Sequence, residues 1–107
     1  MAGFQVTSAF TAGSAGSAAL APVSVNITGF DVSVGVATAA GTMTITVNNL
    51  AGTTIPTYYL LESTTTPVML SIRFPNPLMP TTSAINVAVS AVTNGGAGII
   101  TIYGVAD

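Results

Sequence analysis

The side chains that could carry out chemistry in this chain are few. Its 107 residues include one Arg, three carboxylates and no Lys, His or Cys. A Ser-His-Asp triad, a cysteine nucleophile, a Ser-Lys dyad and a Schiff base each require a residue type that is missing. The charged residues are Asp31, Glu62, Asp107 and Arg73. We therefore expect that the protein is not an enzyme.

Two carboxylates are sufficient for one class of enzyme, the glycoside hydrolases. Asp31 and Glu62 form the pair to consider, because Asp107 is the last residue. We favour the interpretation that both are solvated charges that limit aggregation. Three carboxylates make a poor ligand set for zinc, and the glycine-rich segment 95–98 lacks the Lys of a phosphate loop. We expect neither a metal nor a cofactor.

The low charge is the most informative property of the composition. Charged residues make up 4% of the chain and hydrophobic residues 50%, whereas an ordinary soluble domain is about 25% charged. One Arg cannot neutralise the phosphates of a nucleic acid or of an anionic membrane. The first five residues carry no basic side chain, so we expect no secretory signal. A surface without charge tends to associate, which predicts a homo-oligomer or a docked subunit.

The elements that must position these side chains are strands, because apolar residues alternate from Pro22 onward. Turn residues separate the alternating runs. The segment 39–41 predicts one hairpin, and Asn94-Gly95-Gly96 predicts another. Residues 48–52 tolerate positive φ at the end of a strand. Pro75, Pro77 and Pro80 predict an irregular corner between two sheets. The alternating apolar sets are Val23/Val25/Ile27, Val32/Val34/Val36, Met43/Ile45/Val47, Tyr58–Leu61, Val68/Leu70/Ile72/Phe74, Ile85/Val87/Val89 and 99–103.

This pattern predicts an all-β fold, an antiparallel β-sandwich that is jelly-roll-like or a small barrel, with about six to eight short strands. The sandwich domain is predicted over residues 22–107. Residues 1–21 differ, since Phe4, Val6 and Phe10 are isolated among Ala, Gly, Ser and Thr. We expect this segment to form an extended N-terminal arm that is ordered by contact with neighbours.

Two features of the predicted strands concern recognition. Arg73 lies on the polar face of its strand, where it is expected to pair with a carboxylate across the sheet or at an interface. Tyr58 and Tyr59 suggest a sugar-stacking platform, but adjacent strand residues point to opposite faces, so at most one of them is exposed. The alternatives for these tyrosines are core packing and interface anchoring.

From Val68 onward the order of features is an alternating strand, the corner Phe74-Pro75-Asn76-Pro77-Leu78, the strand 85–91, a glycine-rich turn and Ile100-Thr101-Ile102-Tyr103-Gly104. This order resembles the small β-sandwich virion proteins of tailed bacteriophages, notably the capsid decoration or cement proteins. The resemblance covers roughly residues 22–107. It implies a homotrimer on the capsid surface that clamps neighbouring major capsid subunits, with the arm reaching across to one of them.

The expected function is therefore that of a structural virion protein whose partners are copies of itself and the major capsid protein. Phe4, Phe10, Arg73 and Tyr103 are the candidate interface residues, because buried aromatics and Arg dominate interface energies. Two alternatives remain. One is a carbohydrate-binding or adhesion module of a phage tail or surface appendage. The other is a pilus-like subunit whose arm inserts into a neighbour's sheet.

Overall fold

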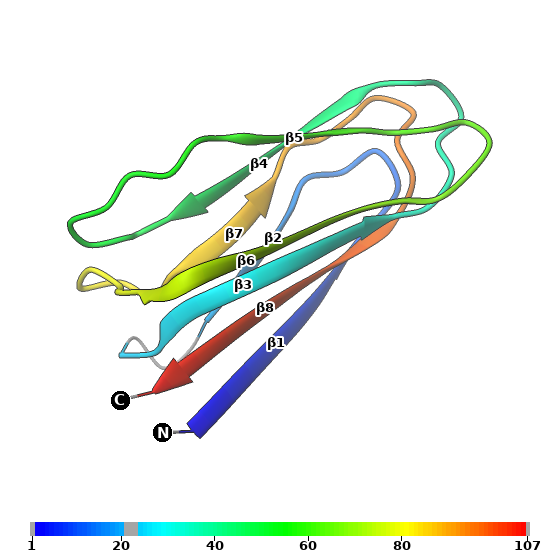
Figure 1. The fold of residues 1–107 in the computed structure, drawn as a ribbon. Coiled ribbons are helices and arrows are strands. Elements are labelled where there is room, and N and C mark those ends of the chain that lie inside the picture. Colours follow the sequence, from blue (N-terminus) through cyan, green and yellow to red (C-terminus); the bar gives the residue numbers. More distant parts are fainter. Residues whose placement is uncertain (1, 21–23, 107) are drawn as a thin grey trace.

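The computed structural model describes residues 2–20 and 24–106 and consists of eight strands in two antiparallel four-stranded sheets (Figure 1). Sheet A has the order β1-β8-β3-β6, and sheet B has the order β2-β7-β4-β5. The predicted all-β sandwich is confirmed. The strands are β1 (Ala2–Phe10), β2 (Gly16–Ala19), β3 (Asn26–Val34), β4 (Thr42–Asn48), β5 (Tyr58–Leu61), β6 (Val68–Leu78), β7 (Asn86–Val89) and β8 (Gly98–Ala106).

The strand order is that of a jelly roll, in which a long hairpin is rolled into two facing sheets. The first strand pairs with the last, β2 pairs with β7, β3 pairs with β6, and β4 pairs with β5. Because neighbouring strands run in opposite directions, the connections β1–β2, β3–β4, β5–β6 and β7–β8 gather at one end of the sandwich (Figure 1). We call this the loop end.

The core lies between the sheets and is made by the alternate residues of each strand. Phe30 of β3 is fully buried and meets Tyr58 of β5 edge-to-face, with ring centroids 5.6 Å apart. Tyr59, the next residue, is 65% exposed, so the expectation that only one of the two tyrosines faces solvent is confirmed. The fully buried large side chains include Leu20, Ile27, Met43, Ile45, Ile85, Ile100 and Ile102.

β3 contains one extra residue that keeps its apolar side chains on one face. Ile27 lies opposite Gly104 of β8, whereas Gly29 lies opposite Tyr103, so two steps on β3 match one step on β8. This bulge allows Ile27 and Phe30, three residues apart, both to point into the core. The alternating sets that end at Ile27 and begin at Val32 were predicted as separate runs, and they instead belong to a single strand with a bulge.

The prolines lie where the pairing of β6 with β3 is interrupted. Arg73 and Leu78 of β6 lie opposite Gly29 and Ile27, so five steps on β6 face two steps on β3. Pro75 and Pro77 fall inside this interval, as expected for residues that cannot donate to a ladder. The strand nevertheless continues to Leu78. The corner between the sheets comes later, at residues 79–85, where Pro80 bridges Leu50.

Both predicted hairpins are wrong, although their turn residues behave as expected. The segment 39–41 connects β3 of sheet A to β4 of sheet B, and Asn94-Gly95-Gly96 connects β7 of sheet B to β8 of sheet A. Asn94 has φ 63°, and Gly95 N–H donates to Val92 C=O at 2.8 Å in a tight turn. Turn residues specify a chain reversal, but burial of the apolar faces decides which strands pair. Asn49 and Gly52 have the positive φ expected after β4.

The structure does not show the extended N-terminal arm. Residues 2–10 form the edge strand β1 against β8 of the same chain, and residues 16–19 pair with β7. The physical reason is that Phe4, Val6 and Phe10 all lie on the inward side of β1, where they pack against the core. In this structure the segment completes the chain's own sheet instead of a neighbour's. Pro22 and Val23, placed near the start of the sandwich from sequence, lie outside the described residues.

Within residues 2–20 and 24–106, no helix has the length and apolar character needed to cross a membrane.

Candidate functional site

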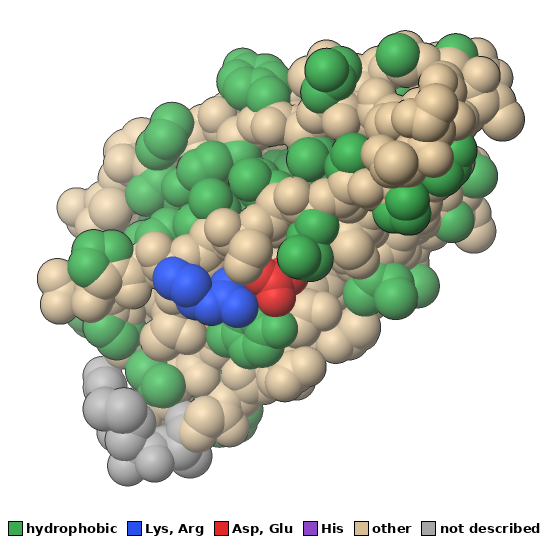
Figure 2. All heavy atoms as spheres, turned by 45° about the vertical axis from the view of Figure 1, so that its right-hand side comes forward, with side chains coloured by type: hydrophobic (Ala, Val, Ile, Leu, Met, Phe, Trp, Pro, Cys, Tyr) green, Lys and Arg blue, Asp and Glu red, His purple; other side chains and the backbone are tan. Residues whose placement is uncertain are grey.

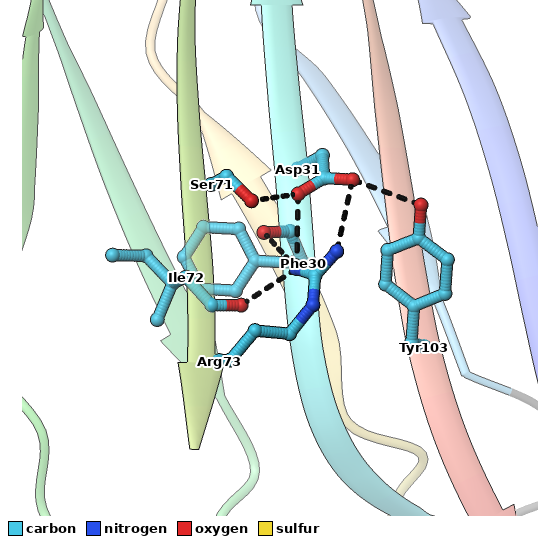
Figure 3. A network of polar contacts seen from close by, with 6 residues as sticks. All are labelled: Phe30, Asp31, Ser71, Ile72, Arg73 and Tyr103. Carbon is cyan, nitrogen blue, oxygen red and sulfur yellow. Dashed lines mark hydrogen bonds and ion pairs between the residues drawn. The ribbon is translucent and has the colours of Figure 1, made fainter.

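A cluster of polar side chains crosses three strands on the outer face of sheet A (Figure 3). Asp31 of β3 accepts hydrogen bonds from Ser71 Oγ at 2.6 Å and from Tyr103 OH at 2.8 Å. Arg73 Nη1 donates to Asp31 Oδ1 at 2.9 Å and to Ile72 C=O at 2.9 Å, and Nη2 reaches Oδ2 at 3.4 Å. The predicted pairing of Arg73 with a carboxylate across the sheet is confirmed.

Gly29 makes this cluster possible. It faces outward between Arg73 and Tyr103, and a Cβ atom there would lie 2.8 Å from Arg73 Cδ and 2.5 Å from Ile72 C=O. The absence of a side chain lets Arg73 lie across β3. Its guanidinium then stacks 4.6 Å from the centre of the Tyr103 ring, a cation–π geometry. The missing side chain at Gly29 therefore allows side chains from β6 and β8 to meet across β3.

The charges of the cluster stabilise each other. Hydrogen bonding to Arg73 lowers the pKa of Asp31 from 3.8 to about 2, with further contributions from Ser71 and Tyr103. Hydrogen bonding to Asp31 raises the pKa values of Arg73 and Tyr103. Asp31 is thus ionised at neutral pH, and each of its two oxygens accepts two hydrogen bonds. These contacts suit a rigid recognition element and leave no proton on Asp31 for general acid catalysis.

Glu62 was expected to be solvated, and this expectation is wrong, since its exposure is 2%. It follows β5 at the loop end, where its N–H donates to Gly41 C=O and its Oε1 accepts from Gly96 N–H at 2.9 Å. Gly95 leaves room for the carboxyl group, because a Cβ there would lie 2.8 Å from Oε2. Glu62 thereby connects three loops. Its Oε2 has no hydrogen-bond partner within the described part of the chain.

The two carboxylates considered for glycoside hydrolysis have separate environments. Asp31 contacts Ser71, Arg73 and Tyr103 on the outer face of sheet A, whereas Glu62 is buried among loop backbones. The two carboxylates share no hydrogen-bond partner. Asp107 lies outside the described residues, and over residues 2–20 and 24–106 no group of three or more His, Cys, Asp or Glu could hold a metal ion.

The outer face of sheet A changes from polar to apolar toward the loop end. The four strands align Thr7, Thr101, Asp31 and Ser71 in one row and Ala9, Ile99, Ser33 and Met69 in the next row. Ile99 is 45% exposed and Met69 is 64% exposed. Figure 2 shows one blue and one red group together among green and tan atoms. Beside the apolar row lies a groove of about 430 Å³, lined by Ala9, Phe10, Ser33, Val34, Gly35, Pro67, Ala97, Gly98 and Ile99.

The candidate interface residues occupy different environments. Phe10 is buried, with its ring against Gly98 and Gly16, and Phe4 packs against the core from β1. Arg73 and Tyr103 belong to the polar cluster on the outer face. Apart from Tyr59, sequence reasoning assigned no role to the exposed apolar side chains. Alternation could have identified Met69, because it lies between the inward-facing Val68 and Leu70. The exposed large apolar residues are Val36, Tyr59, Leu61, Met69, Met79 and Ile99.

No protein-family model, no curated protein and no solved structure matches this chain.

Proposed function

We propose that the protein is a structural subunit of a bacteriophage virion, a decoration or cement subunit that binds between major capsid proteins and stabilises the head. Copies associate with one another, as a trimer if the resemblance holds for assembly. The observation that carries the proposal is the absence of unpaired surface charge over residues 2–20 and 24–106. Within the described residues, Arg73 is paired with Asp31, and Glu62 is buried.

Such a surface favours binding to protein. Removing an ionised side chain from water is costly unless a partner compensates it. Here the exposed ionised side chains of the described residues are Arg73 and Asp31, which compensate each other at 2.9 Å, so little of that cost arises. Exposed apolar side chains then add a favourable contribution when they are buried, at about 25 cal/mol per Å².

The outer face of sheet A is the proposed surface for the capsid. It combines Arg73, Tyr103 and Met69, which are residue types enriched in protein interfaces, with Ile99 and the apolar groove. The polar cluster holds Arg73 and Tyr103 in fixed positions, which lowers the entropy lost when they bind. Jelly-roll sandwiches occur in viral capsid proteins and in lectins, so the fold is compatible with the proposal without identifying the function by itself.

The test uses particles of the virus that encodes the chain. Ile99→Asp places a charge in the apolar row, and Thr42→Asp places the same charge on the outer face of sheet B. We expect the wild type and Thr42→Asp to sediment with the particles and to delay heat-induced genome release, and Ile99→Asp to do neither. A chain that never associates with particles contradicts the proposal. If both variants bind the particles equally well, the contact with the capsid does not lie on the outer face of sheet A.

The second candidate is a carbohydrate-binding module, favoured by the exposure of Tyr59. Its ring lies on β5 beside Leu61, which is 67% exposed, and an exposed aromatic ring can stack on a sugar. Tyr58 packs against Phe30 and is not available for stacking. Saturable binding on a glycan array that disappears in Tyr59→Ala would replace the virion proposal. Absence of glycan binding would remove this candidate.

A further inference from the structure

β1 presents a long, free sheet edge. All nine of its residues pair with β8 without a register shift, from Ala2 opposite Ala106 to Phe10 opposite Gly98. Within the described part of the chain its other side has no neighbouring strand, because β1 is the first strand of sheet A, and Figure 1 shows it at the margin of the fold. Every second residue of β1 therefore directs its N–H and C=O groups away from the sheet.

The edge of β1 lacks the features that usually prevent strand pairing. Such features are Lys residues, prolines, bulges and short length. The other edge of sheet A, β6, contains Pro75 and Pro77 and an interrupted register. Both edges of sheet B, β2 and β5, have four residues each. β1 has nine residues, AGFQVTSAF, with no charge and no proline. Among the four edge strands, β1 alone is open for pairing.

We propose that β1 pairs antiparallel with β1 of a second copy of this chain, across a two-fold axis at Val6, and so joins two copies of sheet A into one continuous sheet. The inference rests on the self-association in the proposed function, and it gives a closed dimer in place of the trimer that the resemblance implies. In this register all nine residues overlap, and each residue meets one that faces the same side of the sheet. Gln5 lies opposite Thr7 on the outer face, and Val6 lies opposite Val6 on the inner face.

The second copy is the occupant that suits this edge best. The pairing uses the same surface on both copies and therefore closes as a dimer. The two margins of the joined sheet are then both β6, the strand protected by its prolines. No like charges meet, since β1 has none. Phe4 and Val6 are half-buried at the margin of the core, and a second β1 would cover more of their apolar surface.

A cysteine introduced into β1 tests the contact directly, because the chain has no cysteine of its own. Directly opposed residues of an antiparallel pair have Cβ atoms about 5 Å apart, close enough for a disulfide to form with small adjustments. We expect Val6→Cys to give a disulfide-linked dimer under mild oxidation. Thr42→Cys, on the interior strand β4, is the matched control and should remain mostly unlinked. Equal linking of both variants would overturn the inference.

A charge variant provides the second measurement. Thr7 is exposed on the outer face of β1, so Thr7→Lys should fold normally and place two Lys residues near the two-fold axis. We expect it to weaken the dimer about tenfold or more, whereas Thr42→Lys leaves it unchanged. If Thr7→Lys associates like the wild type and Val6→Cys does not link, the β1 contact is wrong and self-association stands. If the wild type is a monomer, both the β1 contact and the self-association in the proposed function are wrong.

Discussion

Replacing Asp31 by Asn removes the charge at the centre of the polar cluster and leaves its shape. Asp31 accepts hydrogen bonds from Ser71, Arg73 and Tyr103. Asn keeps one acceptor oxygen, but its NH2 group replaces the other. The hydrogen-bond donors that face this NH2 group are left without an acceptor. We therefore expect Asp31→Asn to lower the free energy of unfolding at neutral pH and to lose this effect in acid.

The size of the effect follows from the pKa of Asp31. Its fall from 3.8 to about 2 corresponds to at most about 2.4 kcal/mol, since one unit of pKa is about 1.4 kcal/mol. The Arg73 side chain is 54% exposed, so solvent screening reduces the expected value to about 1 kcal/mol. Because the pKa is lowered on folding, this stabilisation is fully present above pH 4 and disappears as the pH falls toward 2.

Urea unfolding of both proteins at pH 7 and at pH 2 measures the effect. The two proteins differ at residue 31 alone, so contributions from the rest of the chain cancel in the difference between them. We expect the free energy of unfolding of the wild type to exceed that of Asp31→Asn by about 1 kcal/mol at pH 7 and by much less at pH 2. A difference of the same size at both pH values would show that the charge of Asp31 does not stabilise the fold, and the cluster would lose its assigned role.

Three further substitutions test other parts of the structure by urea unfolding. Tyr103→Phe removes the 2.8 Å hydrogen bond to Asp31 and should lower the free energy of unfolding; no loss at pH 7 would refute this. Gly29→Ala places a Cβ against Ile72 C=O and Arg73 Cδ and should cost about 2 kcal/mol; a neutral result would contradict this close approach of β6 to Gly29. Glu62→Gln keeps an acceptor for Gly96 N–H, whereas Glu62→Ala removes it, so the Ala variant should lose more stability than the Gln variant; an equal loss in both would contradict that role.

Alternation predicted the core strands because their inward residues are large and apolar. Met43, Ile45 and Ile102 are buried as their parity requires. β1 and β2 were missed because their small residues give little hydrophobic signal. Phe4, Val6 and Phe10 are nevertheless separated by even numbers of residues, which places them on one face of a strand. Pairing between distant strands could not be predicted, since local turn residues carry no information on which sheet the next strand joins.

The polar cluster was predictable in part. A single Arg on the polar face of a strand, in a chain with three carboxylates, indicates a cross-strand pair, but not which carboxylate. Assigning Asp31 required knowing that β3 lies between β6 and β8. The burial of Glu62 had no sequence signal, because it depends on three loops that meet at one end of the sandwich.

The mass of the purified wild-type chain in solution is the most direct test of the claim that its weakly charged surface is an association surface. Sedimentation equilibrium at micromolar concentrations should give a multiple of 10.6 kDa. Because the contacts involve few charges, the mass should be the same in low and high salt. A mass of 10.6 kDa throughout this range would contradict the claim.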